Sequence, residues 1–192
     1  MQALKDRIAA EGRNLGNGIL KIDSILNHQI YPELMQQMGE ALAQRFRPLN
    51  IDRILTAEIS GIAPALMTGV VLGVPVVYAR KTKPITMSGP IYLETAPSHT
   101  KGVEVGLMVA AEFLKSGERV LIIDDFLASG KTLAALARMC ISANAEFVGA
   151  GVIVEKSFEN GREFMRKQGY DGVPIEALVV ITSMEDGKIV LA

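Results

Sequence analysis

Two adjacent acids, Asp124 and Asp125, follow the apolar run VLII and precede a turn of small residues, ASGKT, at positions 128–132. Successive backbone N–H groups in such a turn, two hydroxyls and the positive end of a following helix suit a terminal phosphate monoester. The two carboxylates would lie one short turn from that phosphate, a reach comparable to a pentose ring, and carboxylates accept hydrogen bonds from ribose hydroxyls. This segment therefore predicts a site for a phosphorylated sugar.

The ending Gly130-Lys131-Thr132 also resembles the second half of an ATP-binding loop. The motif G-x-x-x-x-G-K-[ST] would place its first glycine at position 125, where a glycine lets the loop wrap the phosphates. Position 125 holds Asp125, whose carboxylate would repel a nucleotide's phosphates, so this alternative fails. A capping acid with a tight turn and no ligand stays open, although two adjacent acids before a Gly-Lys-Thr helix start weigh against it.

The elements that must position these residues alternate between apolar strands and amphipathic helices. We expect helices near the N-terminus with Leu4 and Ile8 on one face, and at about 32–46, 62–73, 131–144 and 159–169. We expect strands at about 52–58, 75–80, 120–125, 146–156, 177–182 and 188–192, and extended chain at 19–29. The βαβ unit at 52–80 should be parallel, so the sequence predicts an α/β domain whose mostly parallel sheet carries helices on both faces.

Three turns should meet beyond the carboxyl ends of the strands, at 58–63, 124–132 and 155–158, because ligands bind there in open parallel sheets. A different kind of segment runs from Arg80 to about Gly102 and is rich in Lys, Thr, Pro, Ser and Gly. It is typical of a long loop, and such loops are either functional lids or disordered segments.

Composition indicates one globular domain over residues 1–192, with 49% hydrophobic residues and a net charge of −1. No basic run or membrane-length apolar stretch is present in the sequence, so we expect neither a nucleic-acid nor a membrane partner. The charged N-terminus lacks the apolar core of a signal peptide, and the single cysteine, Cys140, suits a reducing compartment, so we expect a cytoplasmic protein. Cys140 has the spacing of a packed core thiol, and no metal-ligand spacing occurs.

Several stretches carry a resemblance to a known family. VLIIDDFLASGKT looks like the phosphoribosyl pyrophosphate (PRPP) motif of the type I phosphoribosyltransferases. Over nearly its full length the chain resembles the bacterial xanthine phosphoribosyltransferases, on LKIDSILNHQI, SGIAPALMTGVVLGVPVVYARK, VLIIDDFLASG and GVIVEKSF. LNHQ with VEKSF is the most telling pair, since the second stretch also resembles adenine phosphoribosyltransferases. Those xanthine enzymes tend to have Asn-Gly-Gln where this chain has Ser129-Gly130-Lys131, a departure that keeps the phosphate-binding turn and loosens the substrate assignment.

The resemblance implies the type I phosphoribosyltransferase fold, with a flexible lid loop near 81–102 and a small hood made of about residues 1–30 plus the C-terminal strands. It implies transfer of a 5-phosphoribosyl group from PRPP to xanthine, with Mg²⁺ bound mainly through PRPP and no metal site made by protein side chains alone. A homodimer is also implied.

The resemblance further implies which residues contact PRPP: Ser60, Gly61, Arg80, Lys81, Asp124, Asp125, Ala128, Ser129, Gly130, Lys131 and Thr132. The turn at 128–132 would hold the 5-phosphate and the two acids the ribose hydroxyls. The remaining four would receive the pyrophosphate, where small residues let backbone N–H groups approach and cations balance the leaving group's charge.

For the base, the resemblance implies contacts from Leu20 and Asn27 in the hood, and from Lys156 and Phe158. A lysine only donates hydrogen bonds, so Lys156 would favour a 6-oxo purine over adenine, whose 6-amino group also donates. For Phe158 two interpretations are equally supported: it stacks on the base, or it is a buried core aromatic. Without the family, Lys156 would be interpreted as a surface ion-pair residue and Asn27 as a turn residue.

Alternative functions stay open at this point. Within the enzyme class these are transfer to adenine, guanine or hypoxanthine. In a different class, a purine-responsive regulator would bind PRPP without catalysis, but the opening residues are too few for a winged helix and the net charge of −1 gives no sign of a DNA-binding face.

Overall fold

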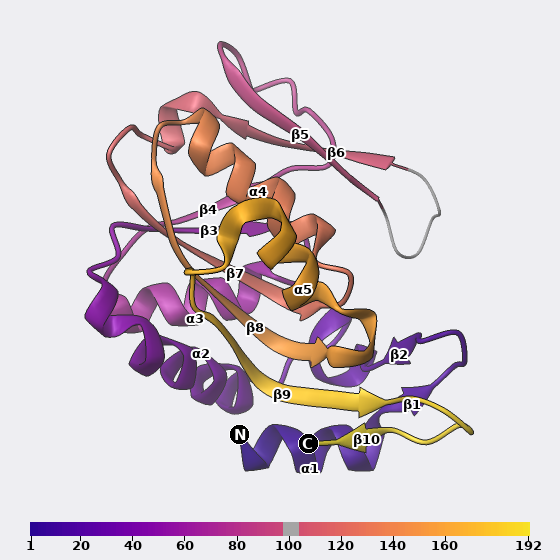
Figure 1. The fold of residues 1–192 in the computed structure, drawn as a ribbon. Helices are drawn as coiled ribbons and strands as arrows, with labels where there is room; N and C mark the ends of the chain where they lie inside the picture. Colours follow the sequence, from indigo (N-terminus) through magenta and orange to yellow (C-terminus); the bar gives the residue numbers. More distant parts are fainter. Residues whose placement is uncertain (98–103) are drawn as a thin grey trace.

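The computed structural model describes residues 1–97 and 104–192 and is built around a six-stranded sheet of order β10-β9-β8-β7-β3-β4 (Figure 1). The strands are β3 (Arg53–Ala57), β4 (Val76–Ala79), β7 (Arg119–Leu127), β8 (Glu146–Lys156), β9 (Ile175–Ser183) and β10 (Val190–Leu191). Neighbouring strands are parallel except β10, which runs antiparallel to β9. The predicted α/β class with a mostly parallel sheet is confirmed.

The two central strands are apolar because both of their faces are covered. Val120–Ile123 in β7 are fully buried, as is most of β8. The parallel register pairs Phe126 with Val154 and Leu127 with Glu155, so β7 and β8 end side by side. The turns that follow these two strands are thereby placed next to each other.

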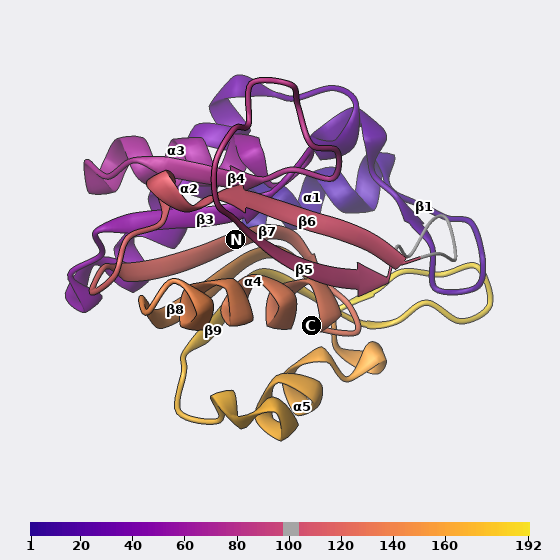
Figure 2. The same cartoon turned by 90° about the horizontal axis from the view of Figure 1, so that it is seen from above.

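Helices cover both faces of the sheet (Figure 2). The longer ones are α2 (Pro32–Phe46), α3 (Ile62–Leu72) and α4 (Lys131–Ser142), joined by the short α5 (Gly161–Met165) and the 3₁₀ or π turns η2 (Arg47–Leu49), η3 (Ala111–Phe113), η4 (Ser157–Glu159) and η5 (Arg166–Tyr170). α2 buries Met38, Leu42 and Phe46 in the core of one face, and α4 buries Leu136 and Cys140 in the core of the other. Cys140 is thus a packed core thiol, as its spacing predicts.

The N-terminal segment comprises α1 (Gln2–Glu11), β1 (Arg13–Asn14), β2 (Leu20–Lys21) and the π-helix η1 (Asp23–Asn27), with β1 antiparallel to β2. The expectation of extended chain over 19–29 is wrong beyond β2. Ile22, Ile25 and Leu26 are all buried, and their spacing of three and four residues lets a helical turn bury them together against the α2 core.

This segment packs against the C-terminal strands, as Figure 1 shows for α1 beside β10. The N-terminal amine donates to the Leu178 carbonyl at 2.8 Å. The Asn14 amide donates to the Met184 carbonyl at 2.7 Å and to the Lys188 carbonyl at 3.0 Å. The two ends of the chain are therefore joined beside β9.

The segment expected to be a long loop contains regular structure. β5 (Ile91–Pro97) pairs antiparallel with β6 (Glu104–Ala110), and a bridge from Arg80 to Met108 joins β6 to the end of β4. Arg138 on α4 holds this β5–β6 pair through its Nε, which lies 2.7 Å from the Glu94 carboxylate. The loop interpretation is therefore wrong for 91–97, and the part of the expected lid at 98–102 lies outside the described residues.

Across residues 1–97 and 104–192, no helix combines the length and apolar character that crossing a membrane requires.

Candidate functional site

The three predicted turns meet at one edge of the sheet because β3, β7 and β8 are neighbours. Ser60 and Gly61 follow β3, the acid pair lies at the end of β7, and Lys156 ends β8. The Ser60 hydroxyl donates a hydrogen bond to the Asp125 carboxylate, which joins the first turn directly to the second. The structure therefore brings together residues that are 65 positions apart in the chain.

Gly61 is packed so closely that no other residue fits without a shift. A Cβ atom there would lie 2.3 Å from the Thr56 hydroxyl oxygen and 3.0 Å from Asp124 Oδ1. The turn after β3 can therefore sit directly on the acid pair only because residue 61 has no side chain.

The two acids have different surroundings. Asp124 is 6% exposed, and its Oδ1 accepts the Asp125 backbone N–H at 3.0 Å. Burial, and then the neighbouring charge of Asp125, raise the pKa of Asp124 well above its usual value, while the positive charge of Lys81 acts in the opposite direction. Asp125 is partly exposed and accepts the Phe126 N–H at 2.8 Å. Burial of Asp124 thus disfavours a negative charge on this carboxyl group.

The turn predicted to hold a phosphate, Ala128–Thr132, is called the phosphate cradle below and forms the entry to α4. Gly130 has a φ of +79°, the left-handed region that favours glycine, and it is the residue before the helix. The first N–H groups of a helix lack intrahelical partners, so this turn presents donors and the positive helix end to a ligand. Ala128 and Gly130 are buried, and the Lys131 side chain is exposed.

The cations after β4 are tied to Glu58, an acid that sequence reasoning missed. Glu58 accepts the Lys81 backbone N–H at 2.6 Å, and its carboxylate lies 3.6 Å from the Arg80 guanidinium. Its place directly after β3, as the first residue of the predicted turn at 58–63, was the available signal. The Lys81 side chain is exposed, and its charge acts on Asp124 as noted above, so Lys81 belongs with the acid pair.

Lys156 connects the end of β8 to the N-terminal segment. Its Nζ donates to the Gly18 carbonyl at 2.6 Å, lies 3.4 Å from the Glu159 carboxylate, and sits 5.4 Å from the centre of the Phe126 ring. The side chain is only 12% exposed, so the interpretation of Lys156 as an ordinary surface ion pair is wrong. Gly18 and Glu159 are further partners that sequence reasoning missed.

The other predicted base contacts differ in exposure. Leu20 is buried at 7% exposure and belongs to the α2 core, whereas Asn27 is exposed at the end of η1. Phe158 is 37% exposed, so it is not a fully buried core aromatic.

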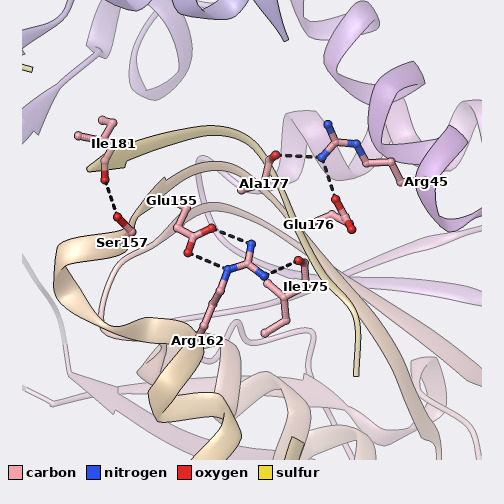
Figure 3. Close-up of polar contacts among 8 residues, drawn as sticks. All are labelled: Arg45, Glu155, Ser157, Arg162, Ile175, Glu176, Ala177 and Ile181. Atoms are coloured by element: carbon pink, nitrogen blue, oxygen red, sulfur yellow. Dashed lines mark hydrogen bonds and ion pairs between the residues drawn. The ribbon is translucent and has the colours of Figure 1, made fainter. Parts of the chain in front are cut away.

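Glu155, the residue before Lys156, takes part in a buried ion pair that sequence reasoning also missed (Figure 3). Arg162 donates from Nε and Nη2 to the two Glu155 oxygens at 2.8 and 2.7 Å, and from Nη1 to the Ile175 carbonyl at 2.7 Å. One guanidinium therefore joins the end of β8, the start of α5 and the start of β9.

Among the described residues, no group of three or more His, Cys, Asp or Glu side chains could hold a metal ion. An Mg²⁺ ion can instead take one or two carboxylates and complete its shell with substrate phosphate oxygens and water. Asp124 and Asp125 are adjacent carboxylates beside the phosphate cradle, so the residues present fit an ion bound in that way.

This chain is similar to known proteins over most of its length. The model of the phosphoribosyl transferase domain family matches residues 23–183. A xanthine phosphoribosyltransferase of Deinococcus deserti is 50% identical over 97% of this chain and 95% of its own. A protein of the same name from Leuconostoc mesenteroides is 44% identical over 99% of both chains.

Solved structures show the same fold. An adenine phosphoribosyltransferase from Trypanosoma brucei, in complex with AMP, pyrophosphate and ribose-5-phosphate, superposes with a TM-score of 0.75 at 22% identity, covering 92% of this chain and 79% of that one. An adenine phosphoribosyltransferase from Thermoanaerobacter pseudethanolicus gives 0.74 at 24% identity, covering 92% and 99%.

Proposed function

Since this chain belongs to the phosphoribosyltransferase family, we propose that it transfers the 5-phosphoribosyl group of PRPP to xanthine. The products are xanthosine 5′-monophosphate and pyrophosphate, and the reaction belongs to purine salvage. The observation that carries the choice of xanthine is identity of 43–50% over nearly the whole chain to proteins of that activity. The solved adenine enzymes support the fold alone, because they are below 25% identical.

We assign the 5-phosphate of PRPP to the phosphate cradle and the ribose hydroxyls to the acid pair. The N–H groups in the first turn of α4 and the positive end of that helix suit the phosphate, and the side chains of Asp124 and Asp125 suit two neighbouring hydroxyls. As the bond from the sugar to pyrophosphate breaks, the sugar becomes oxocarbenium-like and the two carboxylates would stabilise that positive charge.

The turn of Ser60 and Gly61 is assigned to the departing pyrophosphate. Gly61 lets the backbone approach closely, and the exposed Lys81 would balance the growing negative charge. Arg80 could act together with Lys81 by giving up its contact with Glu58 for one with the pyrophosphate. The contact with Glu58 is a long one, at 3.6 Å. Mg²⁺, bound mainly through PRPP oxygens with the acid pair available on the protein side, would supply further positive charge there.

Lys156 is assigned to the oxygen edge of the purine. Two of its three N–H donors are directed at Gly18 and Glu159, and the third is available for a 6-oxo group. Leu20, Asn27 and Phe158 would complete the base pocket from the hood and from η4. Adenine would present its own donor to Lys156 and should be disfavoured.

We further propose that residues 1–192 act as one domain with the N-terminal segment and β9–β10 as its hood, and that the protein forms a homodimer in the cytoplasm. The hydrogen bonds from Met1 and Asn14 to the C-terminal strands support the hood, and the single buried cysteine suits a reducing compartment.

Nucleotide formation from PRPP, Mg²⁺ and each of xanthine, guanine, hypoxanthine and adenine, measured in parallel, tests the function. We expect the highest kcat/KM for xanthine. Adenine as the best substrate would show that the base pocket is misassigned. PRPP binding without turnover of any base would favour a regulator.

A further inference from the structure

Gly161, the first residue of α5, lies directly against the phosphate cradle. A Cβ atom on Gly161 would come within 2.4 Å of the Ala128 carbonyl oxygen, and within 2.7 Å of Cδ1 of Leu127. In the other direction, a Cβ atom on Gly130 would come within 2.7 Å of the Gly161 carbonyl oxygen. Gly161 is therefore in backbone-to-backbone contact with the cradle from Ala128 to Gly130.

The contact is steric in origin, because Gly161 is not among the glycines with positive φ. Residue 161 could adopt its conformation with a side chain, so conformational freedom does not explain a glycine here. The missing Cβ is what lets α5 approach the cradle to this distance.

The start of α5 is also held firmly in place. The next residue, Arg162, donates to both oxygens of Glu155 and to the Ile175 carbonyl, as Figure 3 shows. Moving α5 away from the cradle would separate the Glu155 carboxylate, whose side chain is 7% exposed, from the Arg162 guanidinium. A methyl group at position 161 should therefore displace the cradle rather than α5.

We propose that Gly161 is a positioning residue for PRPP: by packing on the Ala128 carbonyl it sets the shape of the phosphate cradle. This inference rests on the proposed function. The three heavy atoms nearest to a Cβ at position 161 belong to Ala128 and Leu127, not to residues assigned to the base. A change there should therefore weaken binding of PRPP and leave binding of xanthine largely intact.

The test compares Gly161→Ala with Gly172→Ala, a matched control whose Cβ would have no heavy atom within 4 Å and whose φ is not positive. We expect Gly161→Ala to raise the Kd and KM of PRPP about tenfold or more, because misplacing a binding group by less than an ångström weakens a phosphate site strongly. The KM of xanthine should change by less than about twofold to threefold, because the atoms that a Cβ at 161 would meet belong to Leu127 and Ala128 and not to the base pocket. Gly172→Ala should leave both constants unchanged.

A second variant separates a cradle effect from general crowding of the core. Leu127→Ala removes both side-chain atoms that a Cβ at 161 would meet below 3.1 Å, Cδ1 and Cγ, and leaves the Ala128 carbonyl in place. In the Gly161→Ala/Leu127→Ala protein we expect PRPP affinity to stay low relative to Leu127→Ala alone. Recovery of PRPP affinity in the double variant would overturn the proposal, because the effect would then come from Leu127.

Equilibrium binding of PRPP with Mg²⁺ in the absence of base gives a readout independent of turnover. Equal PRPP affinity of Gly161→Ala and the wild type would also overturn the proposal. If the wild type itself failed to bind PRPP, the proposed function would be wrong, and the two failures are therefore distinguishable. If Gly161→Ala alone does not fold, PRPP affinity is compared between Gly161→Ala/Leu127→Ala and Leu127→Ala.

Discussion

The ion pair between the buried Glu155 and the half-exposed Arg162 predicts a loss of stability when only the arginine is removed. In Arg162→Met the apolar stem of the side chain is kept, while the donors to both Glu155 oxygens and to the Ile175 carbonyl are lost. The Glu155 carboxylate, with a side chain 7% exposed, is left without its partner. An uncompensated buried charge is among the most destabilising changes in a folded protein.

The magnitude follows from burial. Removing one partner of a fully buried pair costs about 3–5 kcal/mol. The Arg162 side chain is itself 48% exposed, so water can reach part of the vacated space, and we expect a lower cost, about 2–3 kcal/mol. For a chain of 192 residues each kcal/mol corresponds to about 2–4 °C, so Tm should fall by about 4–12 °C.

A matched control is present in the same part of the chain. Arg166 makes the same two-pronged contact with Glu163, at 2.8 and 2.7 Å, but both side chains are in solvent, at 56% and 44% exposure. Arg166→Met should leave Tm nearly unchanged, since exposed pairs contribute little. Thermal unfolding of both variants gives the comparison, and an equal fall in Tm would refute the argument from burial.

Rescue gives a second check on the same argument. In Glu155→Gln/Arg162→Met the buried group is a neutral amide, whose burial costs less than that of a carboxylate. We expect this double variant to be more stable than Arg162→Met alone. A double variant less stable than Arg162→Met would show that the loss comes from packing and the Ile175 contact, not from the buried charge.

Asp124→Asn should lower kcat/KM about 10- to 100-fold through loss of a charged hydrogen bond, yet raise the free energy of unfolding. The raised pKa of Asp124 means that the wild type loses stability as pH rises from the unfolded pKa, near about 4, toward the folded one. Urea unfolding from pH 4 to 8 should show that the difference in the free energy of unfolding between Asp124→Asn and the wild type grows with pH. A difference that stays constant with pH would contradict this. Lys156→Gln should lower kcat/KM for xanthine about 10- to 100-fold and leave kcat/KM for adenine unchanged or higher. Kinetics are measured with both bases, and an equal loss of kcat/KM for xanthine and adenine would contradict the assignment of Lys156 to the base. Burial raises the pKa of Cys140 to about 12, so Ellman's reagent at pH 8 should find no reactive thiol in the native protein and one after denaturation, and rapid native labelling would contradict the core assignment.

Parts of the fold could be predicted because their signals are local. The unit β3–α3–β4 combines apolar strands with a short turn and a helix, and the parallel connection then follows from chain geometry. The place of the acid pair was predictable for the same reason, since acids that follow a buried apolar run lie toward the end of a strand, although β7 continues past them to Leu127.

Other parts depend on pairing between distant residues. The alternation in IYLETA at 91–96 is hidden among Pro, Gly and Lys, and its partner strand, β6, is recognised only once both are placed side by side. Near 22–26 the apolar spacing did indicate a helical turn, and the neighbouring extended residues obscured it.

Within the candidate site, the sequence predicts the acid pair and the phosphate cradle, because each is a single contiguous motif. It could not locate the contact of Gly161 with Ala128 or of Lys156 with Gly18, because both depend on how separate elements pack. Glycine and lysine are common at surfaces, so neither residue signals such a contact by itself.

The end of β8 has a consequence for how this protein can change in evolution. Glu155 faces α5 while its neighbour Lys156 faces the N-terminal segment, as successive strand residues point to opposite sides. Insertion or deletion of one residue within β8 would move each later side chain to the opposite face of the strand. Lys156 would then face the side of Arg162, and Glu155 the side of Gly18. Lineages that carry a single-residue insertion or deletion within β8 should therefore be eliminated.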